Sequence, residues 1–176
     1  MARIVGYIAA SLDGYIADAA GSLDWLTARD DLTLGEHDYA RFIDTVRTVV
    51  MGRATYDWLE RSGAEWPYSG KRVIVVTSRP MAAAPAGALE TRSDVAGLIA
   101  ELRALDDGDV WLVGGGQLQM AFIARGGLDG LEVYVISQVL GGGVPLFPPT
   151  GFARQLRLLS AKSLGDGCAR LHYAFD

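Results

Sequence analysis

The sequence has very little of the chemistry that metal sites and disulfides need. Its 176 residues include one cysteine, Cys168, and two histidines, His37 and His172, which lie far apart. One cysteine cannot form an intramolecular disulfide, and no cysteine or histidine cluster has metal-ligand spacing. We therefore expect no metal site and a reducing compartment, the cytoplasm.

Two further absences narrow the class of protein. No uninterrupted apolar segment is long enough to span a bilayer, and the first residues enter a strand-like run rather than a signal peptide. The formal net charge is −5, whereas a nucleic-acid-binding surface needs a basic face. With 50% hydrophobic and 21% charged residues, the chain reads as one globular domain over residues 1–176.

The order of apolar runs predicts alternating strands and helices, followed by strands alone. Strands are expected at residues 4–10, 48–51, 72–77 and 110–113, and helices at residues 36–47, 53–61, 94–105 and 117–125. Three later runs, at residues 131–138, 155–163 and 169–175, have no helices between them, and residues 165–167 suit a hairpin turn. Residues 11–24 are expected to form a loop, and residues 80–85 to lack regular structure. This order predicts an α/β fold with a single mostly parallel central sheet, flanking helices and an antiparallel C-terminal edge.

Three glycines follow the apolar run at residues 110–113, and a helical pattern begins directly after them. Backbone N–H groups can approach a ligand closely at glycine, and a helix N-terminus attracts anions. The segment therefore suits a phosphate, although a tight turn without a ligand gives the same pattern; its residues are Val113, Gly114, Gly115, Gly116, Gln117 and Leu118. It is not the dinucleotide fingerprint GxGxxG, because position 119 is glutamine.

Two other strand ends carry hydroxyl groups and a guanidinium. They are Gly52, Arg53 and Thr55 after the second strand, and Thr77, Ser78 and Arg79 after the third. A planar guanidinium matches phosphate, and the second set suits the 2′-phosphate that distinguishes NADP from NAD. Either set alone is also consistent with an ordinary turn or helix start. Because open α/β sheets bind ligands at the carboxyl ends of their strands, the three segments together predict a site for a phosphorylated dinucleotide.

The order and spacing of these motifs resemble the dihydrofolate reductase-like superfamily. The chain is most similar to the reductase domain of the bifunctional riboflavin-biosynthesis deaminase–reductase and its stand-alone relatives. The resemblance runs almost end to end, with landmarks at residues 11–17 (SLDGYIA), 51–56 (MGRATY), 76–79 (VTSR), 113–116 (VGGG), 127–133 (GLDGLEV) and 140–147 (LGGGVPLF). The zinc motif of the deaminase segment is absent, so the similarity is to a free-standing reductase domain.

The resemblance implies NADPH as the cofactor and assigns roles to the strand-end residues. The set after the second strand would hold phosphate, the set after the third would face the adenosine 2′-phosphate, and residues 115–118 would cradle the pyrophosphate. Ala10 and Ile16 would flank the nicotinamide, and Trp25 would close over it, although composition alone favours a core role for this tryptophan. Relatives often have a cis peptide in the glycine triplet, which here points to Gly114–Gly115. Relatives are also often homodimers, for which Tyr134, Ile136 and Val139 would supply apolar contacts.

The proton donor is harder to place. Hydride transfer to a C=N or C=O group needs a proton, usually from a carboxyl group or water. Dihydrofolate reductases carry an acidic residue on the helix before the Met-Gly-Arg motif. Counting back from Met51 points to Glu36, whereas counting forward from the first loop points to Asp24 or Asp30, and Asp13 is a further candidate. Each of these carboxylates is alternatively a solvated charge or a helix cap.

The sequence does not determine the identity of the substrate. The resemblance implies a small heterocyclic or sugar-derived molecule, as in reduction of 5-amino-6-(5-phosphoribosylamino)uracil. The alternatives are dihydrofolate (pterin) reduction, or a nucleotide-binding dimeric protein that keeps this fold without turnover.

Overall fold

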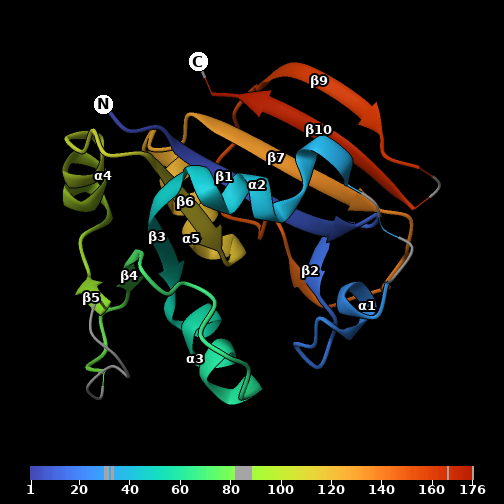
Figure 1. Cartoon of the computed structure of the whole chain (residues 1–176), viewed down its shortest axis with the longest axis horizontal. Helices are drawn as coiled ribbons and strands as arrows, with labels where there is room; N and C mark the ends of the chain where they lie inside the picture. The colour runs from blue at the N-terminus through green and yellow to red at the C-terminus, as the bar shows by residue number, and fades with distance from the viewer. Residues whose placement is uncertain (30–31, 33, 82–88, 166, 176) are drawn as a thin grey trace.

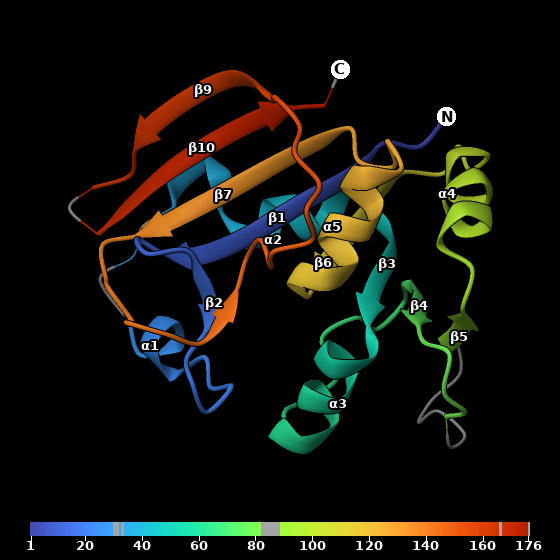
Figure 2. The same ribbon diagram turned by 180° about the vertical axis from the view of Figure 1, so that it is seen from behind.

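An eight-stranded sheet organises the computed structural model, which describes residues 1–29, 32, 34–81, 89–165 and 167–175 (Figures 1 and 2). The strand order is β5-β4-β3-β6-β1-β7-β10-β9. The strands are β1 (Ile4–Ser11), β3 (Val46–Gly52), β4 (Arg72–Val76), β5 (Leu89–Arg92), β6 (Asp109–Gly114), β7 (Gly130–Ile136), β9 (Arg157–Ser163) and β10 (Cys168–Ala174). A separate antiparallel pair joins β2 (Tyr15–Ala17) to β8 (Val144–Pro145).

The strands from β5 to β7 run parallel, and β10 pairs antiparallel with both β7 and β9. The predicted fold class, a mostly parallel sheet with an antiparallel C-terminal edge, is therefore confirmed. The helices are α1 (Asp24–Thr27), the 3-10 helix η1 (Gly35–His37), α2 (Tyr39–Thr45), α3 (Arg53–Ser62), α4 (Val95–Arg103) and α5 (Gly116–Ala124). Helices α2 and α5 cover opposite faces of the sheet, and α3 lies beyond the arrowhead of β3 (Figures 1 and 2).

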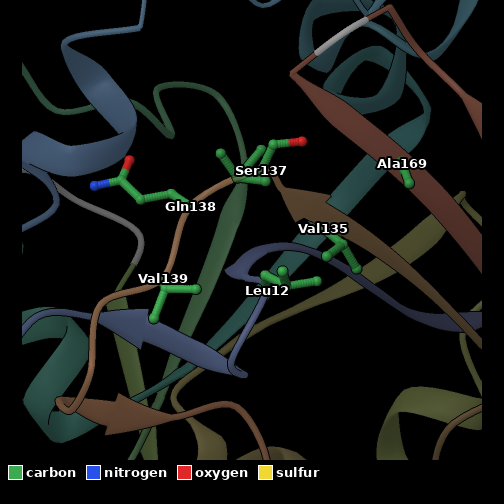
Figure 3. Close-up of a pocket in the computed structure, with 7 residues that line it drawn as sticks. Leu12, Val135, Ser137, Gln138, Val139 and Ala169 are labelled. Carbon is green, nitrogen blue, oxygen red and sulfur yellow. The ribbon is translucent and has the colours of Figure 1, made fainter.

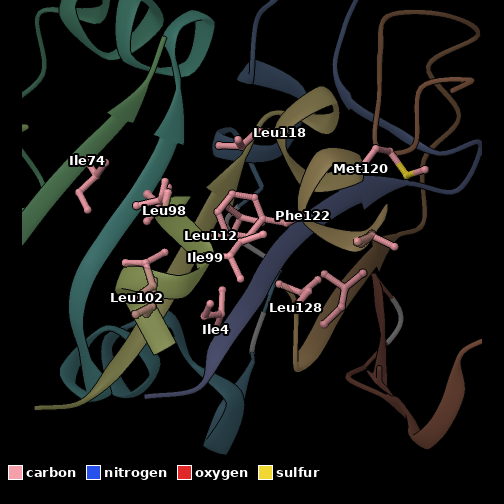
Figure 4. Close-up of a cluster of buried hydrophobic side chains, with 14 of the residues drawn as sticks. Ile4, Ile74, Leu98, Ile99, Leu102, Leu112, Leu118, Met120, Phe122 and Leu128 are labelled. Carbon is pink, nitrogen blue, oxygen red and sulfur yellow. The ribbon is translucent and has the colours of Figure 1, made fainter. Parts of the chain in front are cut away.

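Side chains alternate across the sheet and make two apolar layers. Under α4 and α5, the layer is mainly aliphatic, and Figure 4 shows Ile4, Leu98, Leu102, Leu112 and Phe122 gathered there. Under α2, the layer is aromatic. Tyr7 stacks on Phe42 with ring centroids 4.3 Å apart, and Trp111 meets Phe42 edge-on at 5.3 Å. Because both faces are covered, the central strands read as continuous apolar runs.

Local sequence signals placed most elements, and a local helix cap and a long-range strand pairing account for two of the exceptions. The helix expected at residues 36–47 is divided, because the Asp38 carboxylate accepts the N–H of Ala40 and starts α2. Val46 and Arg47 belong to β3 instead. The loop expected at residues 11–24 contains β2, whose partner β8 lies far away in the sequence. Strand β5 was not expected, and most of residues 80–85 and part of the turn at 165–167 lie outside the described residues.

Four alternating charges join β4, β5 and α4. Arg72 Nε lies 2.7 Å from Glu90 Oε1, and Arg92 Nε lies 2.9 Å from Glu101 Oε2. Arg92 also reaches Glu90, at 2.7 Å between Nη2 and Oε2. The hydrogen bond from Arg72 is the largest cause that lowers the pKa of Glu90, from its ordinary value near 4.5 to about 2.

This network predicts an acid-dependent stability. Because the pKa of Glu90 is depressed by folding, its contribution is complete above about pH 4.5 and is lost as the pH falls towards 2. We expect Glu90→Gln to lower the free energy of unfolding at pH 7, and the gap to the wild type to narrow steadily below about pH 5. Urea unfolding of both proteins at several pH values measures this gap. A gap that stays constant between pH 7 and pH 3 contradicts the assignment.

Candidate active site

The carboxyl ends of β3 and β6 lie side by side, and a helix starts at each of them. Met51 pairs with Gly114 across the two strands. Gly52 is the N-cap of α3, and Gly115 is the N-cap of α5, and within the described part of the chain no side chain caps either helix. The N–H groups at the starts of α3 and α5 therefore lie at the same edge of the sheet. This arrangement favours the binding of an anion there.

Packing within the fold does not require glycine at either N-cap position. A Cβ atom on Gly115 would lie 3.9 Å from Thr55 Oγ1 and 4.0 Å from Ile16 Cδ1. A Cβ atom on Gly52 would lie 3.7 Å from the carbonyl oxygen of Gly114. These are ordinary van der Waals distances, and the φ angles of −77° and −69° suit any residue. Ile16, Gly52, Thr55 and Gly115, all predicted to bind the cofactor, therefore meet at this point.

The other two glycines of the triplet are required by the fold. Gly114 has a φ of +118°, and the Gly114–Gly115 peptide is cis, as the resemblance implied. A Cβ atom on Gly116 would collide with the carbonyl oxygen of Pro145 and would lie 2.8 Å from that of Leu146. Gly116 is therefore explained by close packing against residues 145–148, and a ligand is not needed to account for it.

Asp13 fastens the loop that carries Ile16. Its carboxylate accepts the Ser11 hydroxyl at 2.7 Å and the N–H groups of Leu140 at 3.0 Å and Gly141 at 2.7 Å. These hydrogen bonds, the one from Ser11 foremost, hold the pKa of Asp13 below its usual value. Both carboxylate oxygens are thus engaged in joining two loops, which indicates a structural role for this candidate proton donor.

The two cationic strand ends lie next to each other. The Arg53 guanidinium donates to Asp57 Oδ1 from Nε at 2.6 Å and to the carbonyl oxygen of Pro80 from Nη1 at 3.2 Å. Pro80 directly follows Arg79 in the turn after β4, where Thr77 Oγ1 accepts the N–H of Arg79 at 3.1 Å. Ser78 and Arg79 are exposed. The turn after β4 therefore presents a guanidinium and hydroxyls beside the start of α3.

The remaining predicted cofactor residues contribute less side-chain surface. Ala10 and Leu118 are 2% and 7% exposed and pack in the aliphatic layer, whereas Val113 packs in the aromatic one. These three would meet a ligand through their backbone. Gln117 is exposed in the first turn of α5. Trp25 packs against the cluster of Tyr134, Ile136 and Cys168, and its buried Nε1 has no hydrogen-bond partner among the described residues.

Two further acidic candidates, Glu36 and Asp24, lie in the part of the chain that the structure describes. Glu36 Oε1 lies 3.0 Å from Lys162 Nζ, and this hydrogen bond is the main cause that lowers the pKa of Glu36. Asp24 is exposed in the first turn of α1, and Asp30 lies outside the described residues. None of Asp13, Asp24 and Glu36 is among the atoms nearest to Gly52 or Gly115.

The sequence analysis did not identify Gln119 as a functional candidate. It is a fully buried polar side chain in α5, close to the glycine triplet at residues 114–116. Its Nε2 and Oε1 atoms have no hydrogen-bond partner among the described residues. The Oε1 atom would lie 3.8 Å from a Cβ on Gly114, and the Nε2 atom 3.2 Å from one on Gly6. Only its spacing could have indicated that Gln119 is buried, because position 119 shares a helix face with the buried Phe122 and Ile123.

The family described as "RibD C-terminal domain" matches residues 3–169. The chain belongs to this family. The uncharacterized protein YwjB of Bacillus subtilis (strain 168) is 33% identical to it over 171 residues, covering 97% of each chain. A putative riboflavin biosynthesis protein from Shewanella sp. PV-4 has a similar structure, with a TM-score of 0.82 and 30% identity over 99% of this chain and 98% of that one.

Dihydrofolate reductase from Enterococcus faecalis, complexed with NADP(H) and RAB-propyl, shares the fold. Its TM-score is 0.69 at 18% identity, over 98% of this RibD C-terminal domain protein and 95% of the reductase. The predicted dihydrofolate reductase-like superfamily is therefore confirmed, and the family and its neighbours support an oxidoreductase role. Across the described ranges, no helix is long and apolar enough to cross a membrane.

Proposed function

We propose that this protein is an NADPH-dependent reductase that transfers hydride to a small heterocyclic or sugar-derived substrate. The sheet edge at Gly52 and Gly115 carries the proposal. It lies at two helix N-termini, and packing does not account for glycine at either position. A phosphate approaching the backbone does account for it, because N–H groups and helix dipoles stabilise an anion there.

The described residues fit the rest of NADPH. The pyrophosphate would lie at the starts of α3 and α5, with the Thr55 hydroxyl beside it, and the 2′-phosphate at Thr77, Ser78 and Arg79. The nicotinamide would lie by the Ile16 side chain and the backbone of Ala10. When bound, the cofactor supplies the hydride, and the chain binds and orients it.

Titration with NADPH, followed by nicotinamide fluorescence, tests this proposal directly. We expect saturable binding in the micromolar range. Turnover is then measured as loss of the reduced nicotinamide absorbance with a ribosylamino-pyrimidine phosphate and with dihydrofolate, which separates riboflavin-type from pterin reduction. Absence of binding at high micromolar NADPH overturns the proposal.

A nucleotide-binding protein without turnover is the second candidate. The engagement of Asp13 by two loops and of Glu36 by Lys162 favours it, because neither carboxylate is an evident proton donor. Tight NADPH binding with no oxidation across pyrimidine, pterin and quinone substrates would support this candidate over the reductase.

The cationic strand ends predict selectivity for NADPH over NADH. We expect Arg79→Ala to weaken NADPH about tenfold or more and to leave NADH nearly unchanged, since a charge-assisted hydrogen bond is lost only with the former. Arg53→Ala should behave likewise if Arg53 also meets the 2′-phosphate, whereas equal losses for both nucleotides place it at the pyrophosphate. Arg61→Ala, in the last turn of α3, is the matched control. Equal affinities of the Arg79 variant and the wild type would contradict the assignment.

A homodimer is also proposed, and of the three residues first expected at its interface only Val139 is exposed. Tyr134 and Ile136 are 2% and 1% exposed inside the protomer, so they cannot supply the contacts that the resemblance suggested. Val139 and Leu12 are 64% and 66% exposed, and they line an apolar hollow of about 300 Å³ with Val135 (Figure 3). Exposed apolar side chains that lie together can be buried when two copies of a protein associate. Sedimentation velocity tests this, and a monomer at high protein concentration overturns it.

A further inference from the structure

A second cavity lies on the side of the sheet that α2 covers, and the glycines at the N-caps of α3 and α5 do not line it. Its volume is about 260 Å³, and it is lined by residues of η1, α2, β1, β7 and β10. Arg3 and Asp109 line it, and they stand at the amino-terminal starts of β1 and β6, whose opposite ends form the candidate active site. The cavity is therefore separate from the proposed NADPH site.

One wall of this cavity is aromatic. The Tyr7 ring packs against Phe42 and against Tyr134, with centroids 4.3 Å and 4.6 Å away. The phenol groups are already used: Tyr7 donates to the carbonyl oxygen of His37 at 3.0 Å, and Tyr134 donates to Glu132 Oε2 at 2.8 Å. The wall therefore offers apolar ring surface more than free hydroxyls.

The carboxylates around the cavity all have partners. Arg170 holds Glu132 at 2.6 and 2.8 Å, and Arg3 holds Asp109 at 2.6 and 3.1 Å. Lys162 binds Glu36, and the N–H of Ala40 binds Asp38.

Two basic groups of the cavity lack such partners. Arg41 and His172 both line it, and neither side chain makes a hydrogen bond or ion pair with any described residue. Burial is the main cause that lowers the pKa of His172, which leaves a neutral imidazole able to donate or accept. A guanidinium and an imidazole are therefore the unmatched groups beside an aromatic wall.

We propose that this cavity binds a small aromatic carboxylate. The carboxylate pairs with Arg41 and hydrogen-bonds to His172, and the ring lies along Tyr7 and Phe42. Arg41 disfavours a cation, and the surrounding carboxylates of Glu36, Asp38, Asp109 and Glu132 disfavour a dianion such as phosphate. The volume, just below the range of typical ligand pockets, limits the guest to about one ring.

Fluorine NMR with fluorobenzoate as the probe tests the proposal on the full chain. We expect saturable binding that persists in excess NADPH, and proton NMR should show a shift of the ring resonances of His172. Arg41→Gln should weaken it about tenfold or more, as expected for one charge-assisted hydrogen bond. Arg61→Gln removes an exposed cation elsewhere and should have no effect. Fluorobenzamide, the neutral analogue, should bind at least about tenfold more weakly than the acid.

Several results would overturn the proposal. Equal binding by Arg41→Gln and the wild type removes the guanidinium from the site. Displacement of fluorobenzoate by NADPH moves the probe to the strand ends, and displacement by equimolar inorganic phosphate shows a general anion site instead. Absence of binding at millimolar probe also rejects it. None of these outcomes bears on NADPH binding itself, which the nicotinamide titration measures separately.

Discussion

Replacing Gly115 with alanine is expected to weaken NADPH binding roughly 100-fold, about 2.7 kcal/mol, while leaving the protein as stable as before or slightly more so. The added methyl group makes only ordinary contacts with Thr55 and Ile16, at 3.9 and 4.0 Å. Its backbone conformation, with φ at −69°, suits alanine. A compatible change from glycine to alanine stabilises by about 0.4–1 kcal/mol through the unfolded chain. The same methyl group fills the space where a phosphate would approach the backbone.

Gly116→Ala is the matched control, one residue away. Its methyl group collides with the carbonyl oxygens of Pro145 and Leu146, so we expect a loss of about 1–3 kcal/mol in the free energy of unfolding. Urea unfolding and NADPH titration on both variants separate the two roles. Should Gly115→Ala retain wild-type affinity, the glycine at the α5 N-cap is only part of a turn, and the proposed cofactor site fails with it.

This contrast shows what the sequence could reveal about the site. Glycine, hydroxyl and guanidinium groups at three strand ends are local patterns, and parallel pairing of β3 with β4 and β6 brings them to one edge. The patterns could not distinguish Gly115, where a Cβ atom would make only ordinary contacts, from Gly116, which packs against a distant segment. Only the position of residues 145–148 separates these two roles.

Long-range partners also explain why the proton donor could not be placed. The Asp13 carboxylate binds N–H groups 127 and 128 residues away, and no periodicity in its own loop signals that contact. Glu36 binds Lys162, which lies 126 residues away on β9. Counting positions along the chain identifies carboxylates near a motif. It cannot identify their hydrogen-bonding partners, which lie in distant parts of the sequence.

The largest expected loss of stability comes from Glu132→Leu, at about 3–5 kcal/mol. The Arg170 side chain is 7% exposed and donates to both Glu132 oxygens, at 2.6 and 2.8 Å. Removing the carboxylate leaves this buried cation without its anion. Burial would raise the pKa of Glu132, but the bonds from Arg170 and Tyr134 outweigh it and keep the pKa below its usual value. The pair is therefore charged at neutral pH, and its contribution is lost only in acid.

Asp109→Leu provides the comparison, because Arg3 holds Asp109 through the same two-bond geometry at the surface. Arg3 is 71% exposed, so water can solvate it after the change, and we expect a loss of at most about 1 kcal/mol. The double variant Glu132→Leu/Arg170→Met removes both buried charges and should recover most of the loss. Urea unfolding at pH 7 measures all three. Equal losses for Glu132→Leu and Asp109→Leu would mean that burial of Arg170 does not govern the cost, because that burial is the main difference between the two pairs.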